Sequence, residues 1–399
     1  MSADDYVWPV ALRLRDGTEI TNIPSIDVQH DMLSPGSAWA ATLWWSSTQS
    51  SEWRTIRRKC VCGEMVFVEI GGATQMLGRI EETSTNAEGH NGGLELTISG
   101  RDIIGRLIDW DADPRTQLRN TTLEEAIAAL CDPFGVRVYA CEAAAEREAR
   151  GLPRRGRRTR TGRPRRRSVI DATRIQIGQR VWEVIDKLCR ANGFLVWGAP
   201  TEYSNTVELV IDKPASASPP VFAFERVAQT DGTYRGNMLS GRHHVSTRNV
   251  PTEVTAFGHT ALTTGTDARI QRTAFNDRLV SPYVVAPDAF GPQPRFLRPD
   301  QARTEAAIGK AAERTFAKAM GDFRSYDVRV RGFGQLVGNS RRLYTQNTGA
   351  HVRDDCEEPA IDENMLIRSV HFHQSRERGQ VTELVLVPDG AITVTPDET

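Results

Sequence analysis

Short segments of alternating side chains, separated by turn residues, run through the N-terminal quarter of the chain and constrain the fold more than any other feature. In residues 65–70, Val66, Val68 and Ile70 share one face at a period of two, which is typical of a half-buried β-strand. Strands of this kind are expected at 10–15, 20–28, 39–45, 65–70, 75–81 and 93–99, with glycine-rich turns between them. Six short strands so close together predict a small barrel or sandwich.

A different pattern follows, in which helices alternate with strands. Ser99 and Gly100 precede helical spacing at 103–108, and residues 121–124 (TTLE) are expected to form a capping box for a helix that ends before Pro133. Residues 178–192 have the apolar spacing of a second amphipathic helix. Strands are expected at 136–140, 194–198 and 206–211. This middle segment therefore predicts a mixed α/β unit.

The last segment returns to β-structure. Strands are expected at 240–246, 253–258, 326–331, 351–354, 366–374 and 381–387. An alanine-rich helix is expected at 299–320, after a proline-rich arm at 278–299. At roughly 150 residues per domain, the chain of 399 residues has room for two or three domains. We predict an N-terminal β-barrel domain at 1–115, a mixed α/β domain at 116–235 and a second β-barrel domain at 236–399, so the fold class is α+β and mostly β.

One arginine-rich segment stands out from an otherwise mildly acidic chain. Residues 153–167 contain nine arginines and no acidic residue, which leaves 41 basic against 51 acidic residues elsewhere. Such a loop can be solvated, can contact an acidic partner, or can bind nucleic-acid phosphates. It contains no aromatic residue for base stacking. The arginines are Arg154, Arg155, Arg157, Arg158, Arg160, Arg163, Arg165, Arg166 and Arg167.

Motifs for catalysis and for metal binding are weak in this sequence. The pairs Cys60/Cys62 and His371/His373 lack the spacing of a zinc site, no Gly-x-Ser-x-Gly occurs, and the glycines at 71–78 fit a hairpin turn better than a phosphate loop. The adjacent carboxylates at 81–82, 124–125 and 357–358 are more simply solvated or helix-capping charges. We therefore expect no enzyme, no cofactor and no metal. No apolar run is long enough for a membrane span.

Three blocks, in this order, resemble the baseplate hub proteins of contractile-tailed phages, the Mu-like family related to the late-control tail proteins. The first combines residues 62–68 with the strand, turn and helix at 96–109, which contain Gly100, Arg101 and Asp102. The second is the helix at 178–193, and the third combines 364–372 with 379–387. In the first block we place Gly100 in the tight turn, with Arg101 and Asp102 as local hydrogen-bonding or salt-bridge partners.

The resemblance implies a structural protein of the virion tail baseplate, assembled in the host cytoplasm. Each chain of a homotrimer would contribute two tail-tube-like β-barrels to a pseudo-sixfold ring. That ring would join the sixfold tail tube protein to the threefold central spike protein, would contact other baseplate or tape-measure proteins, and would let double-stranded DNA pass during ejection without specific binding. Two alternatives stay open: a tail-associated peptidoglycan hydrolase, and a nucleic-acid-binding module that uses the arginine-rich segment.

Overall fold

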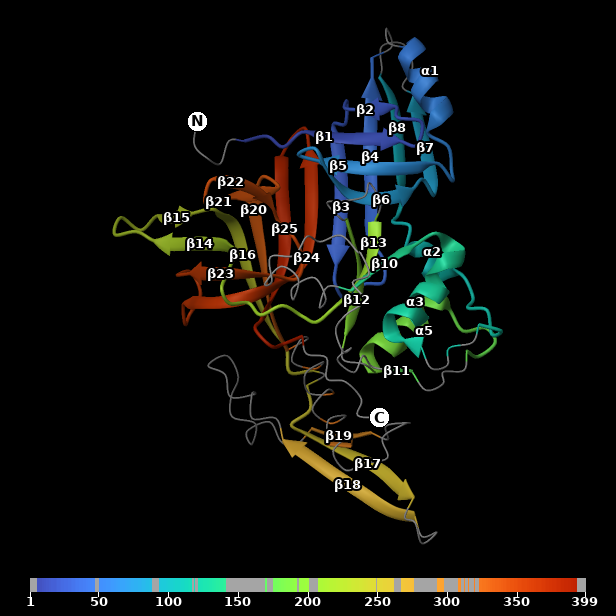
Figure 1. The fold of residues 1–399 in the computed structure, drawn as a ribbon. Helices are drawn as coiled ribbons and strands as arrows, with labels where there is room; N and C mark the ends of the chain where they lie inside the picture. The colour runs from blue at the N-terminus through green and yellow to red at the C-terminus, as the bar shows by residue number, and fades with distance from the viewer. Residues whose placement is uncertain are drawn as a thin grey trace.

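The fold was analysed in a computed structural model of the chain. It describes residues 6–46, 50–87, 93–116, 118, 121–140, 169–170, 175–191, 194–200, 207–248, 250–261, 267–275, 293–297, 308–309, 312, 315, 319 and 323–392. The described part is mostly β, and an upper body of sheets carries helices on one side and a small three-stranded sheet below (Figure 1). The mostly-β expectation is therefore confirmed. None of the sheets formed by the described strands closes into a barrel.

The N-terminal part consists of two sheets packed face to face. Strands β2, β1, β5 and β6 form one sheet, and β3, β4, β8 and β7 belong to the large sheet of eleven strands. Pro24, which has no N–H to donate, lies between β2 and β3, where one continuous strand was expected. The elements are β1 (Val10–Leu14), β2 (Glu19–Ile20), β3 (Ser25–Asp31), β4 (Ala38–Trp45), α1 (Ser50–Lys59), β5 (Met65–Ile70), β6 (Ala73–Arg79), β7 (Glu82–Ala87) and β8 (Leu94–Arg101).

The middle part is a small three-stranded sheet with helices packed beside it. Strand β13 pairs in parallel with β10 and antiparallel with β12. The expected capping box is present one residue later, at Thr122 and Glu125. The elements are α2 (Gly105–Asp109), β9 (Thr121–Thr122), α3 (Leu123–Cys131), the short 3-10 helix η3 (Asp132–Phe134), β10 (Arg137–Ala140), β11 (Val169–Ile170), α5 (Val181–Ala191), β12 (Leu195–Pro200) and β13 (Val207–Asp212).

The C-terminal part supplies seven strands to the large sheet, along with two smaller sheets. Strands β17, β18 and β19 form the sheet at the bottom of Figure 1, and β21 pairs with β22. The elements are β14 (Phe222–Ala228), β15 (Tyr234–Gly236), β16 (Met238–Val245), β17 (Glu253–Ala261), β18 (Asp267–Phe275), β19 (Pro294–Leu297), β20 (Arg324–Arg331), β21 (Gly334–Val337), β22 (Ser340–Leu343), β23 (Thr348–Asp354), β24 (Ile361–Ser375) and β25 (Gly379–Pro388).

The long strand β24 joins the two β-rich ends of the chain. Its first half pairs with β23, and after an irregularity between Ile367 and Ser369 its second half pairs with β3 on the same side. Strand β25 pairs along its other side. A single hydrophobic core contains Val28 from β3, Phe372 from β24 and Leu384 from β25. The two ends of the chain thus form one sheet with one core.

The N-terminal arm crosses between these two ends and is fixed by Trp8. The Trp8 N–H donates to Gln380 Oε1 at 2.8 Å, and Gln380 Nε2 donates to the Trp8 carbonyl at 2.6 Å. The indole lies against Gly71 on one side and Gly334 on the other, where any Cβ would be within 3 Å of the ring. Trp8 is buried, and its indole packs between Gly71 and Gly334, which come from opposite ends of the chain.

Several expectations fall wholly or partly outside the described residues. The arginine-rich segment 153–167 lies outside them, so its interpretations stay predictions. Of the expected helix at 299–320, residues 308, 309, 312, 315 and 319 are described, and they are helical. The end of the proline-rich arm forms β19, which pairs in parallel with β17. No helix in the described part of the chain is long and apolar enough to cross a membrane.

Candidate functional site at the strand-to-helix junction

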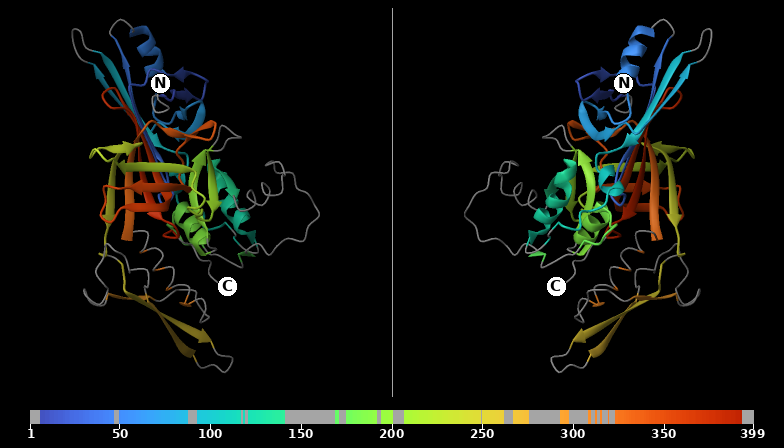
Figure 2. Two further views of the ribbon diagram at one scale, coloured as in Figure 1. Left: turned by 90° about the vertical axis from the view of Figure 1, so that its left-hand side faces the viewer. Right: turned by 90° about the vertical axis from the view of Figure 1, so that its right-hand side faces the viewer.

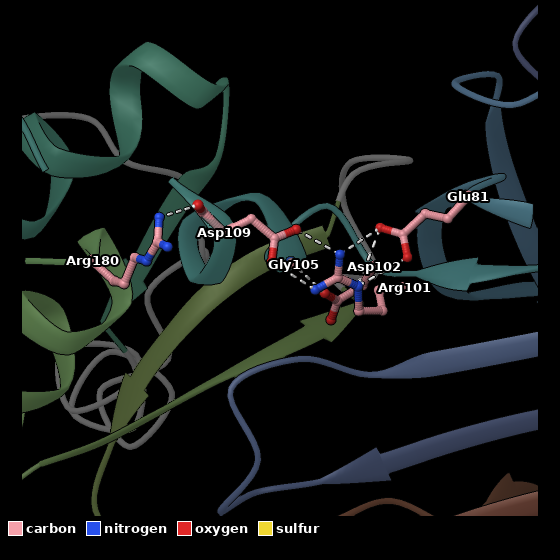
Figure 3. Close-up of polar contacts among 6 residues, drawn as sticks. All are labelled: Glu81, Arg101, Asp102, Gly105, Asp109 and Arg180. Carbon is pink, nitrogen blue, oxygen red and sulfur yellow. Dashed lines mark hydrogen bonds and ion pairs between the residues drawn. The ribbon is translucent and has the colours of Figure 1, made fainter. Parts of the chain in front are cut away.

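The Gly-Arg-Asp motif lies where the large sheet meets the helices of the middle part (Figure 3). Gly100 belongs to strand β8 and pairs with Trp39, so it lies before the turn and not in it as expected. Its φ is not in the left-handed region. Glycine is needed because a Cβ would lie 1.8 Å from the carbonyl oxygen of Arg79. The close approach of this backbone, and not the turn conformation, therefore explains the residue.

Arg101 connects the sheet to α2 through two carboxylates. Its guanidinium donates to Glu81, with Nε 2.9 Å from Oε2, and to Asp109, with Nη2 2.6 Å from Oδ2. Glu81 directly precedes β7, and Asp109 is the last residue of α2 (Figure 3). Hydrogen bonds to Asp109 and Glu81 raise the pKa of Arg101, and the bond from Arg101 lowers the pKa of Asp109. Because these side chains are partly exposed, the ion pairs contribute little to the free energy of unfolding. Their main effect is to fix the position of α2 relative to the sheet.

The buried carboxylate of Asp102 stabilises the turn between β8 and α2. The carboxylate is buried and accepts the backbone N–H of Ser37 at 3.0 Å and that of Gly105 at 3.2 Å. Strand β12 covers it closely, since a Cβ on Gly198 would lie 2.9 Å from Asp102 Oδ2. Burial raises the pKa of Asp102 to about 6, although the backbone hydrogen bonds act in the opposite direction. Asp102 thus binds the backbone of Gly105 within the turn and that of Ser37, 65 residues earlier.

Arg180 extends the junction to α5 and was not singled out by the sequence. Its Nη1 donates to the carbonyl oxygen of Asp109 at 2.6 Å and to Asp111 Oδ1 at 2.8 Å. Backbone hydrogen bonds between Val181 N–H and the Trp110 carbonyl accompany it. A continuous path therefore runs from β7 through Arg101 and α2 to the start of α5. The partners lie 69 to 71 residues apart, and no local motif indicates such a contact.

Replacement of Asp102 with asparagine should reveal a stability term that depends on pH. Because burial raises its pKa from 3.8 to about 6, the folded protein binds more protons than the unfolded chain between these values. The Asp102 contribution to the free energy of unfolding should therefore fall by roughly 2 to 3 kcal/mol as the pH rises from about 4 to 7. Denaturant unfolding of the wild type and of Asp102→Asn across this pH range measures this contribution. If the free energies of unfolding of the two proteins changed with pH in parallel, the prediction would be wrong.

The other sequence candidates that the structure describes have several separate partners, and Cys60 is buried. Glu125 serves the helix cap and Glu357 lies 3.8 Å from His243. His371 and His373 both contact Asp27 Oδ1, at 3.1 and 2.7 Å. Within the described ranges, no group of three or more His, Cys, Asp or Glu side chains is arranged to hold a metal ion. The motif residues connect the large sheet to α2 through hydrogen bonds and ion pairs.

Comparison with solved structures places the whole chain in one known fold. A tail protein from Neisseria meningitidis MC58 matches with a TM-score of 0.72 and 21% identity, covering 98% of this chain and 99% of that one. The 43 kDa tail protein of prophage MuSo2 from Shewanella oneidensis matches with a TM-score of 0.70 and 17% identity, covering 97% and 100%. The chain has the fold of these phage tail proteins.

More distant structures share this tail-protein fold. An Escherichia coli component of the type VI secretion system, described as structurally similar to the T4 bacteriophage tail proteins gp27 and gp5, matches with a TM-score of 0.54 and 9% identity, covering 94% of this chain and 76% of that one. No family model and no curated protein matches the sequence. The expected resemblance to phage tail proteins is therefore confirmed at the level of fold.

Proposed function

We propose that this protein is the hub of a phage tail baseplate, a structural protein without catalytic activity. Three chains form a pseudo-sixfold ring that joins the sixfold tail tube to the threefold central spike and lets DNA pass. The observation that carries the proposal is the fold match to phage tail proteins over almost the entire length of both chains.

The two halves of the large sheet support a ring with pseudo-sixfold symmetry. One path of paired strands runs β7-β8-β4-β3-β24-β25-β20-β16, with four strands on each side of the β3 to β24 pairing. Three chains would bring six such four-stranded units. Among the described strands, β7 and β16 each pair with only one neighbour in this path. Pairing of β16 with β7 of the next chain would close the ring into a barrel and remove both open edges.

The sheet face away from the core suits a lumen through which DNA passes. His371 Nε2 lies 3.1 Å from Asp27 Oδ1, and Glu383 lies 3.8 Å from both His371 and Arg329. The hydrogen bond to Asp27 raises the pKa of His371. Positive and negative groups thus alternate across β3, β24, β25 and β20. Because their charges compensate, such a wall attracts phosphates only weakly.

Cross-linking between the two open edges tests the ring directly. We expect the double variant Ser84→Cys/Ser240→Cys, made in a Cys62→Ser/Cys356→Ser background, to form covalent dimers and trimers with a short bis-maleimide. Both serines are exposed, and the two replaced cysteines are the exposed ones among the described residues. Native mass should match three chains of 44.3 kDa, and negative-stain images of the same peak should show rings with a central hole.

Two controls make the outcome decisive. Each single cysteine variant should give no covalent trimer, and Thr233→Cys, on the exposed turn between β14 and β15, should not replace Ser240→Cys. A protein that stays monomeric, even after mixing with tail-tube or spike protein, would overturn the proposal. Cross-links that form equally well with the Thr233 variant would overturn the assigned edge contact.

A further inference from the structure

A cavity of about 440 Å³ opens where the N-terminal arm, the start of β16 and the β21–β22 hairpin meet. In Figure 1 the β21–β22 hairpin lies on the left of the upper body, above β15. Its volume falls in the range that holds one or a few side chains of a bound ligand. The residues used below come from these three elements and from the end of β20, and they line the cavity: Tyr6, Trp8, Leu239, Arg331, Leu336 and Arg341.

Large apolar side chains are exposed at the rim of this cavity. Leu239 is 49% exposed, Leu336 is 48% exposed and Tyr6 is 39% exposed. Leu239 lies at the irregularity of the β16 ladder between Met238 and Ser240. Three such side chains lie around one hollow, and clustered exposed apolar side chains mark interaction sites.

The described residues that line the cavity include two arginines, Arg331 and Arg341, and no acidic residue. The guanidinium carbon of Arg341 lies 4.2 Å from the centre of the Tyr6 ring, a cation–π contact that holds the cation at the rim. Arginine in such a place recognises carboxylates, often with two parallel hydrogen bonds.

We propose that this cavity binds a peptide segment of another protein in which an aromatic or aliphatic side chain is flanked by carboxylates. The apolar side chain enters the hollow between Leu239, Leu336 and the arm, and the carboxylates pair with Arg331 and Arg341. Charge complementarity selects this partner over a basic or a purely polar peptide. All of these residues belong to one chain, and Leu239 lies at the start of β16, the strand whose edge the proposed ring pairs with the next chain.

Fluorescence anisotropy with three labelled synthetic peptides tests the proposal on the full chain. The probe is Gly-Asp-Glu-Leu-Trp-Glu-Asp-Gly, and the controls are Gly-Lys-Lys-Leu-Trp-Lys-Lys-Gly and Gly-Asp-Glu-Ser-Ser-Glu-Asp-Gly. We expect saturable binding of the probe at least tenfold tighter than either control. Arg341→Glu and Leu336→Ser should each weaken probe binding about tenfold. Arg115→Glu, a charge reversal at an exposed arginine of the middle part, should leave it unchanged.

Each alternative result contradicts the proposal. Equal binding of the acidic polar control would reduce the site to a nonspecific cationic surface. Loss of probe binding in the Arg115→Glu variant would also show that the peptide binds a nonspecific cationic surface. If Arg341→Glu or Leu336→Ser instead changed the native mass of the protein without added peptide, a second copy of the chain would be the occupant. Melting curves identify any variant that fails to fold. We expect Leu336→Ser to fold, because it alters an exposed side chain.

Discussion

Gly100→Ala should remove most of the soluble protein or lower its free energy of unfolding by about 3 kcal/mol or more. The added methyl carbon would lie 1.8 Å from the Arg79 carbonyl oxygen, and that oxygen belongs to the backbone at the end of β6. Neither strand can move without disturbing its neighbours, because Gly100 pairs with Trp39 in the same sheet. Soluble yield and chemical denaturation measure the loss, and valine should be worse than alanine.

Ser99→Ala provides the matched control for Gly100→Ala. Ser99 precedes Gly100 in β8 and already carries a Cβ, so this substitution leaves the strand backbone where it is. We expect a change within about 0.5 kcal/mol, as is usual for substitutions away from packed or hydrogen-bonded features. If Gly100→Ala were as mild as Ser99→Ala, the close approach of Arg79 would not be the reason for glycine.

Trp8→Ala should destabilise the protein by about 3 to 5 kcal/mol, the usual cost of truncating a buried tryptophan. The indole fills the space between Gly71 and Gly334, which come from opposite ends of the chain. Its removal leaves a cavity that these turns cannot fill with side chains of their own. The paired hydrogen bonds between the Trp8 backbone and Gln380 should also weaken as the arm loses its anchor. Thermal and denaturant unfolding measure the effect.

Val7→Ala is the control for the arm, since Val7 is 72% exposed and lies next to Trp8. We expect almost no change in the free energy of unfolding for this variant. An equally small effect of Trp8→Ala would show that the arm is not a structural wedge. Limited proteolysis at the arm, faster in Trp8→Ala alone, would separate local release of the arm from global destabilisation.

Local sequence patterns predicted the strands and helices that have one apolar face and one polar face. The alternation in 65–70 corresponds to β5, and the glycines at 71 and 72 form the turn to β6, both with positive φ. The helix near residue 181 follows from its apolar stripe. By contrast, β7 (ETSTNA) carries polar residues on both faces, and α1 is strongly polar, with Trp53 contacting Trp45. Neither segment has the run of regularly spaced apolar residues by which a strand or a helix is predicted from sequence.

Contacts between distant segments could not be predicted from the sequence. The pairing of β3 with β24 depends on which edges meet in three dimensions, and alternation within each strand leaves the partner undefined. The same holds at the junction, where Arg101 was expected to find a local partner but reaches Glu81, 20 residues earlier. The structure was needed to show which segments Arg101 connects.

The pairing of β3 with β24 also sets an order of events during translation. Asp27 and His371, which meet across this pair, are 344 residues apart. The edge of β3 therefore stays unpaired until the ribosome has synthesised β24, and an unpaired edge invites association with other chains. We expect a chain that stops before β24 to aggregate, because nothing in it covers this edge.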